Sequence, residues 1–205
     1  MAVPRIKRIE NDKYFTEDRL TDALLKRIDL RGRILECCAG DRAIARRIHN
    51  KVATHSGSVV LSSDLTDSET SEFPLLHADQ TTDATTREFW ENYNRPGTQV
   101  LNWVVTNPPF NVAPKIIPLA YKNSRVGIAM LLRLSYLEPC ANRAAWLQSN
   151  ADNLKLVMPV NPRPRFRADT KGTDSCTVAW FVWDKQHSWK SLGVDCPFVF
   201  AAGWR

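Results

Sequence analysis

A chain of 205 residues with 43% hydrophobic residues is long enough for one sizeable folded domain, and this composition argues against disorder. The formal net charge of +6 favours a polyanionic partner, and no apolar run reaches the length of a membrane span. The five cysteines and four histidines show neither CxxC nor HExxH spacing, so we expect reduced thiols, a cytoplasmic protein and no metal site.

The pattern of apolar residues predicts helices and strands that alternate along the chain. Helices are expected over residues 14–28, 42–52, 85–93, 113–123 and 139–149, the first with Thr16 as its N-cap and the last packing through residues 144–147. Strands are expected over residues 33–37, 57–62, 73–79, 100–106, 125–134, 154–159, 177–183 and 196–201. This alternation predicts one α/β domain over residues 13–205, preceded by a loose basic arm over residues 1–12.

The tetrapeptide Asn107-Pro108-Pro109-Phe110 ends an apolar strand, because proline cannot donate to a sheet ladder. It therefore forms a rigid turn at the carboxyl end of a central strand, where open α/β sheets bind their ligands. The amide oxygen of Asn107 and the carbonyl oxygen of Pro108 can there accept hydrogen bonds from one amino group, beside the flat face of Phe110. An ordinary turn is the alternative, since Asn-Pro favours turns anywhere.

Acidic residues follow the predicted strands that precede this tetrapeptide. They lie in the turn Glu36–Asp41, at Asp64 and at Asp79, and the carboxyl ends of parallel strands share one edge of a sheet. Each acid alone is equally consistent with an N-cap or a solvated surface residue. Acids at successive strand ends together with the rigid turn indicate a binding site.

With these motifs the chain resembles the S-adenosylmethionine-dependent methyltransferases that modify the exocyclic amino group of adenine. Tyr14-Phe15-Thr16 is similar to the cofactor motif at the amino terminus of that family, residues 34–40 to its strand-turn motif, and Asn107-Pro108-Pro109-Phe110 to its catalytic tetrapeptide. The resemblance implies a Rossmann-like methyltransferase fold, a mostly parallel seven-stranded sheet with the last strands antiparallel and helices on both faces. The cofactor contacts that it implies are Tyr14, Phe15, Thr16, Glu36, Cys37, Ala39, Gly40, Asp41, Asp64 (ribose), Leu65, Asp79 (adenine) and Asn107.

Later segments resemble the compact adenine methyltransferases of bacteriophages and prophages, which implies double-stranded DNA as partner and a bacterial host cytoplasm. These segments are residues 131–138, 163–166, 173–175 and 180–183. The target base would leave its stack to reach the pocket, and the loop over residues 160–175 would hold the nucleic acid. The expected contacts are Arg133, Arg163, Arg165, Phe166 and Arg167, although Phe166 is also consistent with a loop anchor packed on the core.

The chain departs from the family pattern in three places. Arg42 stands where a second glycine is usual, Cys37-Cys38 replaces a proline-containing turn, and no separate target-recognition domain is present. We interpret the cysteines as apolar fillers rather than nucleophiles. We expect either relaxed specificity that rests on residues 160–175 or a partner subunit that supplies specificity. The alternatives are methyl transfer to RNA adenine or a protein glutamine amide, and a non-catalytic nucleic-acid-binding protein.

Overall fold

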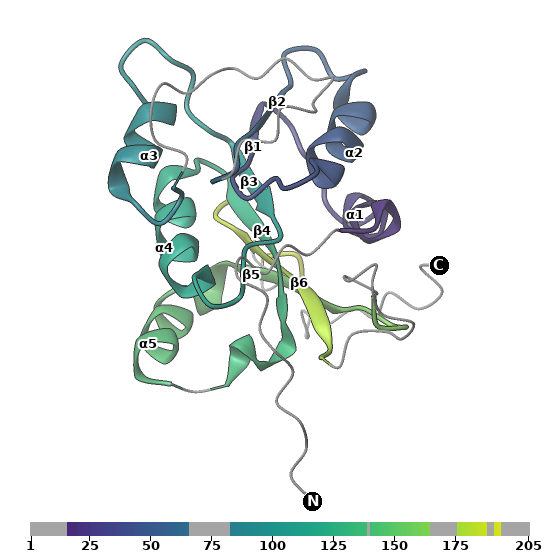
Figure 1. Ribbon diagram of the computed structural model, residues 1–205, viewed down its shortest axis with the longest axis vertical. Helices are drawn as coiled ribbons and strands as arrows, with labels where there is room; N and C mark the ends of the chain where they lie inside the picture. The colour runs from purple at the N-terminus through teal and green to yellow at the C-terminus, as the bar shows by residue number, and fades with distance from the viewer. Residues whose placement is uncertain (1–15, 66–82, 139, 165–175, 188–190, 194–205) are drawn as a thin grey trace, which may run out of the picture.

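The computed structural model describes residues 16–65, 83–138, 140–164, 176–187 and 191–193. Its centre is a six-stranded sheet in the order β2-β1-β3-β4-β6-β5 (Figure 1). The strands are β1 Arg33–Glu36, β2 Val59–Ser62, β3 Trp103–Thr106, β4 Gly127–Arg133, β5 Leu154–Pro159 and β6 Val178–Asp184. The predicted strands over residues 73–79 and 196–201 lie outside the described residues.

The sheet is mostly parallel, as predicted. Strands β2, β1, β3 and β4 are neighbours in parallel register, and antiparallel pairing is confined to β6, which pairs with β4 on one side and β5 on the other. The parallel strands therefore all end at one edge of the sheet, which we call the carboxyl edge. The opposite edge, where β4 begins and β6 ends, is called the amino edge.

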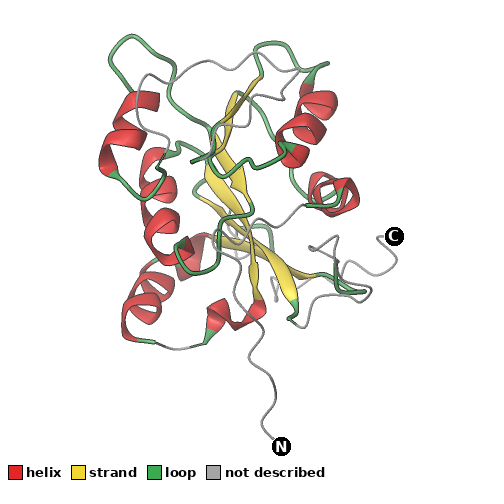
Figure 2. Cartoon of the chain, in the orientation of Figure 1, coloured by secondary structure: helices red, strands yellow, loops and turns green. Residues whose placement is uncertain are grey.

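Helices cover both faces of the sheet (Figure 2). They are α1 Asp18–Leu25, α2 Ala43–Val52, α3 Arg87–Tyr93, α4 Ala113–Asn123 and α5 Ala141–Ser149, with short 3-10 turns at Leu134–Leu137 and Ala151–Asn153. Helices α1 and α2 lie on one side of the sheet, and α3, α4 and α5 lie on the other (Figure 1). Among the described residues, no helix combines the length and apolar character needed to cross a membrane.

Alternation along the strands builds a core on each face. In β4, Ile128 and Met130 belong to the core that also contains residues of α3 and α4, whereas Ala129 and Leu131 belong to the core shared with α1 and α2. All four side chains are 0% exposed, because a central strand is covered on both faces. The near-continuous apolar run of this strand follows from that double coverage.

Two predicted details of the helices are wrong. Thr16 is not the N-cap of the first helix, because the helix begins later, with Glu17 as the capping residue. In α5, Trp146 and Leu147 pack against the core, but Ala145 is exposed. The helix predicted across two prolines is confirmed as α4, with Pro114 in the first turn and Pro118 inside the helix.

Candidate functional site

The carboxyl edge brings the predicted turns together. Strand β1 pairs with β2 and with β3, so the residues that follow Glu36, Ser62 and Thr106 leave the sheet on the same side. Strand β4 runs further. Thr106, the last residue of β3, pairs with Met130, and Arg133 lies three residues further along β4. This register explains how an arginine from β4 reaches the turn after β3.

The turn after β1 is tied to the end of β2 by two hydrogen bonds. The Ala39 N–H donates to the Ser63 carbonyl at 2.9 Å, and the Gly40 N–H donates to Asp64 Oδ2 at 2.8 Å. Gly40 has a φ of +50°, and a Cβ placed there would meet no atom within 4 Å. The turn therefore combines a backbone conformation that favours glycine with open space in front of it.

Arg42 occupies the position where the family pattern has a second glycine. Its φ of 62° lies in the left-handed region, and the residue is only 7% exposed. The backbone here therefore keeps the conformation that glycine favours, although an arginine supplies it.

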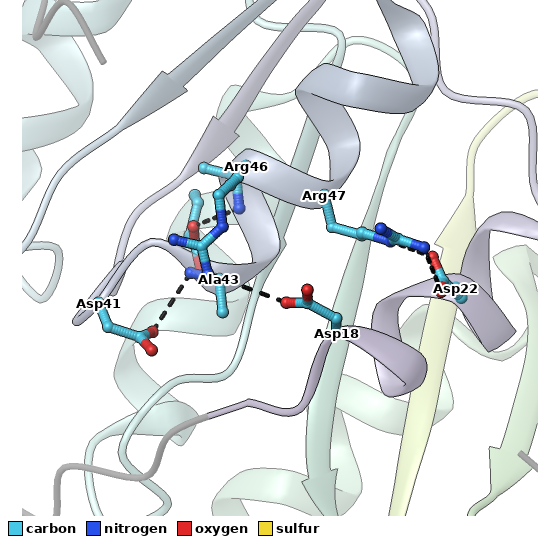
Figure 3. Close-up of polar contacts among 8 residues, drawn as sticks. Asp18, Asp22, Asp41, Ala43, Arg46 and Arg47 are labelled. Carbon is cyan, nitrogen blue, oxygen red and sulfur yellow. Dashed lines mark hydrogen bonds and ion pairs between the residues drawn. The ribbon is translucent and has the colours of Figure 1, made fainter. Parts of the chain in front are cut away.

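Two carboxyl groups occupy the beginning of α2 (Figure 3). Asp41 Oδ1 accepts from the Ala43 N–H at 3.2 Å, and Glu36 Oε2 accepts from the Ala45 N–H at 2.7 Å. These acceptors take amide groups that a diphosphate would use in a dinucleotide-binding fold. The arrangement fits a ligand that carries no phosphate at this position.

Glu36 is 2% exposed, and its environment disfavours ionisation. Burial raises its pKa well above the usual range, and the neighbouring Asp41, Cys38 and Asp64 raise it further, against the opposing hydrogen bond from Ala45. Cys37 lies beside it, and the hydrogen bond with Cys38, together with burial, raises the pKa of the Cys37 thiol. A thiol that stays protonated is a poor nucleophile, which supports the interpretation of Cys37 as a filler.

Asn107, the first residue of the tetrapeptide, has its amide held from one side only. Its Nδ2 donates to Thr16 Oγ1 at 3.1 Å, across 91 residues of sequence. Its Oδ1 is buried and accepts no hydrogen bond from the described part of the chain. A buried acceptor left unpaired costs about 1–3 kcal/mol, so such an atom at a strand end is a candidate for binding a donor on a ligand.

Phe110, the last residue of the tetrapeptide, is stacked against Arg133. The guanidinium carbon of Arg133 lies 4.7 Å from the centroid of the Phe110 ring, and the ring packs against the core shared with α1 and α2. Arg133 Nε is buried without an acceptor among the described residues. The sequence predicted that Arg133 contacts phosphate, and in the structure its guanidinium group lies over the ring of Phe110.

Helix α1, which begins two residues after Thr16, is fixed by contacts that the sequence does not signal. Arg47 Nη2 donates to Asp22 Oδ2 at 2.7 Å, which joins α1 to α2 (Figure 3). The buried Trp180 Nε1 donates to the Leu20 carbonyl at 2.9 Å, which joins α1 to β6. Both contacts depend on residues distant in the chain, so only the folded structure brings them to light.

The remaining predicted site residues divide into two groups. Leu65 and Arg163 are exposed, and Pro108 is buried behind the turn. The others lie outside the described residues, so their predicted roles stay predictions: Tyr14, Phe15, Asp79, Arg165, Phe166 and Arg167.

Neither the protein-family models nor the curated proteins contain a match to the sequence. Among solved structures, a modification subunit of a putative type I restriction enzyme from Vibrio vulnificus is similar with a TM-score of 0.63 and 11% identity, over 86% of this chain and 45% of that one. A type I restriction-modification methyltransferase subunit from Streptococcus thermophilus is similar with a TM-score of 0.53 and 12% identity, over 85% of this chain and 45% of that one. A putative class I S-adenosylmethionine-dependent methyltransferase from Listeria monocytogenes is similar with a TM-score of 0.57 and 12% identity, over 96% of this chain and 68% of that one.

These similarities concern the fold, because the identities are low. The chain spans less than half the length of the two restriction-system subunits. The mostly parallel sheet and the antiparallel β6 agree with the expectation drawn from the sequence. The chain has the Rossmann-like α/β fold of S-adenosylmethionine-dependent methyltransferases.

Proposed function

We propose that this chain transfers a methyl group from S-adenosylmethionine to the exocyclic amino group of adenine in DNA. The observation that carries the proposal is the buried Oδ1 of Asn107, which has no partner among the described residues and lies at the end of β3, three residues before Phe110. An exocyclic amino group is planar and offers two N–H donors. An amide acceptor and an aromatic face are the groups that such a substrate needs.

The tetrapeptide would act mainly by orientation. The lone pair of an adenine amino nitrogen is delocalised into the ring, which makes it a weak nucleophile. If Asn107 Oδ1 and the Pro108 carbonyl each accept one of its hydrogens, the nitrogen is held with its lone pair directed at the methyl group. The neighbouring carbonyl of Pro109 is already engaged, since it accepts from the N–H groups of Val112 and Ala113 at 3.0 Å each.

Residues around the turn after β1 would hold the cofactor. Gly40 leaves open space, Asp64 closes the turn from the end of β2, and the capped start of α2 suits a ligand without phosphate. The cofactor would supply an electrophilic methyl group on a sulfonium sulfur, which keeps the electron pair of the broken C–S bond. The amino nitrogen gains the methyl group and then releases one proton to solvent.

The choice of DNA rests on charge and on the tetrapeptide's surroundings. The chain carries a formal net charge of +6, and Arg133 brings a guanidinium to the turn while Arg163 lies exposed after β5. A base inside a duplex cannot reach a buried amide, so the target base must leave its stack. The ring of Phe110 would then contact the base, and arginines would contact neighbouring phosphates.

The test is incubation of the purified chain with methyl-labelled cofactor and separate pools of double-stranded DNA, RNA and protein. We expect label in DNA, at the amino group of adenine, and none with Asn107→Ala. Asn111→Ala is the matched control, because Asn111 is an exposed asparagine in the following turn. Label in RNA or at protein glutamine instead would show that DNA is not the substrate. No label in any pool would contradict the methyltransferase activity.

A further inference from the structure

The contact between Thr16 and Asn107 has a direction, and that direction decides whether the amide is useful. A primary amide has one acceptor atom and one donor nitrogen, whereas a hydroxyl both donates and accepts. The pair can therefore bond in two ways, with either end of the amide toward Thr16. Only the arrangement seen here, in which Nδ2 donates to Thr16 Oγ1 at 3.1 Å, leaves Oδ1 available to a methyl acceptor.

The direction of this hydrogen bond depends on which acceptor receives the Thr16 hydroxyl proton. Thr16 is 7% exposed, and its hydroxyl proton has no acceptor among the described residues. While that proton is uncommitted, it can be donated to Asn107 Oδ1, which would turn the amide nitrogen toward the acceptor site. A donor facing a donor would repel the amino group that is to be methylated. Another acceptor for the Thr16 proton would therefore fix the useful direction, which the structure already shows.

We propose that Thr16 is a positioning residue that couples cofactor binding to the orientation of the Asn107 amide. This inference rests on the proposed function. The amino-acid part of the cofactor carries a carboxylate, which can only accept hydrogen bonds. Once Thr16 donates its proton to that carboxylate, only lone pairs remain on its oxygen. The Asn107 amide must then present Nδ2 to Thr16 and Oδ1 to the substrate.

The position of Thr16 suits this role because helix α1 is fixed on two sides. The buried Trp180 donates to the Leu20 carbonyl, and Arg47 pairs with Asp22. Leu20 and Leu24 are 0% exposed and pack in the core with Ile44 of α2. Thr16 lies two residues before the first residue of this fixed helix, so its hydroxyl can impose a direction on its partner, whereas a mobile hydroxyl would follow the partner.

The test is NMR of the chain labelled with ¹⁵N-asparagine, with the Asn107 side-chain signals identified by their loss in Asn107→Asp. The probe is S-adenosylhomocysteine, which binds as the cofactor product and cannot transfer a methyl group. We expect the probe to slow exchange of the Asn107 amide protons at least tenfold in the wild-type chain and in Thr16→Ser. In Thr16→Val, which removes the hydroxyl, the probe should leave the exchange unchanged.

A matched control comes from helix α1, which begins two residues after Thr16. Thr21 is 0% exposed, and its Oγ1 has no partner among the described residues, so Thr21→Val changes a buried hydroxyl that makes no such contact. Thr21→Val should respond to the probe as the wild type does. In turnover assays, Thr16→Val should lower kcat by about tenfold or more with little change in the KM for nucleic acid, because orientation is lost rather than substrate binding.

The outcomes separate this inference from the proposed function. Failure of S-adenosylhomocysteine to bind the wild-type chain would overturn both. Binding with the same Asn107 response in Thr16→Val and the wild type would overturn the coupling alone. Loss of the response in Thr21→Val as well would also overturn it, because the effect would then reflect packing of α1. A response retained in Thr16→Ser and lost only in Thr16→Val supports it.

Discussion

The two edges of the sheet differ in whether their buried polar groups have hydrogen-bond partners. At the amino edge, Asp184 is 1% exposed and accepts from Lys155 Nζ at 2.9 Å and from the N–H groups of Gln186 at 2.8 Å and His187 at 3.0 Å. Next to it, Lys185 donates to the carbonyls of Tyr121 and Ser124. At the carboxyl edge, Asn107 Oδ1 and Arg133 Nε are buried without partners among the described residues.

This difference separates stability from function. A buried charge that is fully bonded holds strands and helices together, and nothing remains for a ligand to bind. A buried acceptor or donor left unpaired weakens the fold but is ready for a partner that arrives later. The contrast concerns these named groups rather than every polar atom. Glu36 at the carboxyl edge is buried and accepts from the Ala45 N–H, and Trp183 Nε1 near the amino edge is buried without an acceptor in the described structure.

The comparison can be tested most strongly at Asn107. Asn107→Ala should reduce methyl transfer by roughly 100- to 1000-fold, the range seen when one preorganised hydrogen-bonding group is removed from an active site. Thermal stability should change little, since the substitution removes an unpaired acceptor along with one hydrogen bond. Single-turnover rates and the melting temperature measure the two effects. A large loss of stability with unchanged turnover would reverse the assignment of this edge.

Asp184 gives the opposite expectation. Asp184→Ala leaves the Lys155 charge and two backbone N–H groups without their acceptor, so the free energy of unfolding should fall by about 2–3 kcal/mol. The value lies at the lower end for buried pairs because the Lys155 side chain is 19% exposed. Urea unfolding measures it, with Asp29→Ala as control at a surface pair. Turnover per folded molecule should stay unchanged, and a specific loss of turnover would extend the site to the amino edge.

Arg133 sharpens the comparison from the donor side. Arg133→Met keeps an apolar chain over the Phe110 ring but removes the guanidinium that lies 4.7 Å from the ring centroid. We expect the KM for DNA to rise about tenfold, since a hydrogen bond to a charged group contributes about 1.5–3 kcal/mol. Steady-state kinetics measure this, and the exposed Arg95→Met is the control. An unchanged KM would show that Arg133 only packs against Phe110.

Glu36 provides the smallest effect, as a dependence of stability on pH. Its folded pKa is raised, so between its unfolded pKa, about 4.3, and the raised value the folded state binds more protons than the unfolded state. Stability should therefore fall as pH rises through this window. Glu36→Gln cannot ionise and keeps an acceptor for the Ala45 N–H, so it should remove that decline. Unfolding curves between pH 4.5 and 8 measure it, with the exposed Glu91→Gln as control.

The sequence alone determined the fold class and predicted the place of the candidate site. The double proline ends β3 because proline cannot donate to the ladder, and the apolar run of β4 predicts a strand covered on both faces. Parallel strands then bring their carboxyl ends to one edge. These rules act between residues close in sequence or through a general property of sheets, so they can be read without coordinates.

Only the tertiary structure decided which groups are paired at that edge. Threonine is a residue type favoured at N-caps, yet the Thr16 hydroxyl accepts a hydrogen bond from Asn107. Packing of α1 against α2 and β6 brings Thr16 to the end of β3. Arg133 reaches Phe110 because of the register between β3 and β4. Contacts between residues far apart in the chain depend on register and packing, and local sequence patterns carry no record of either.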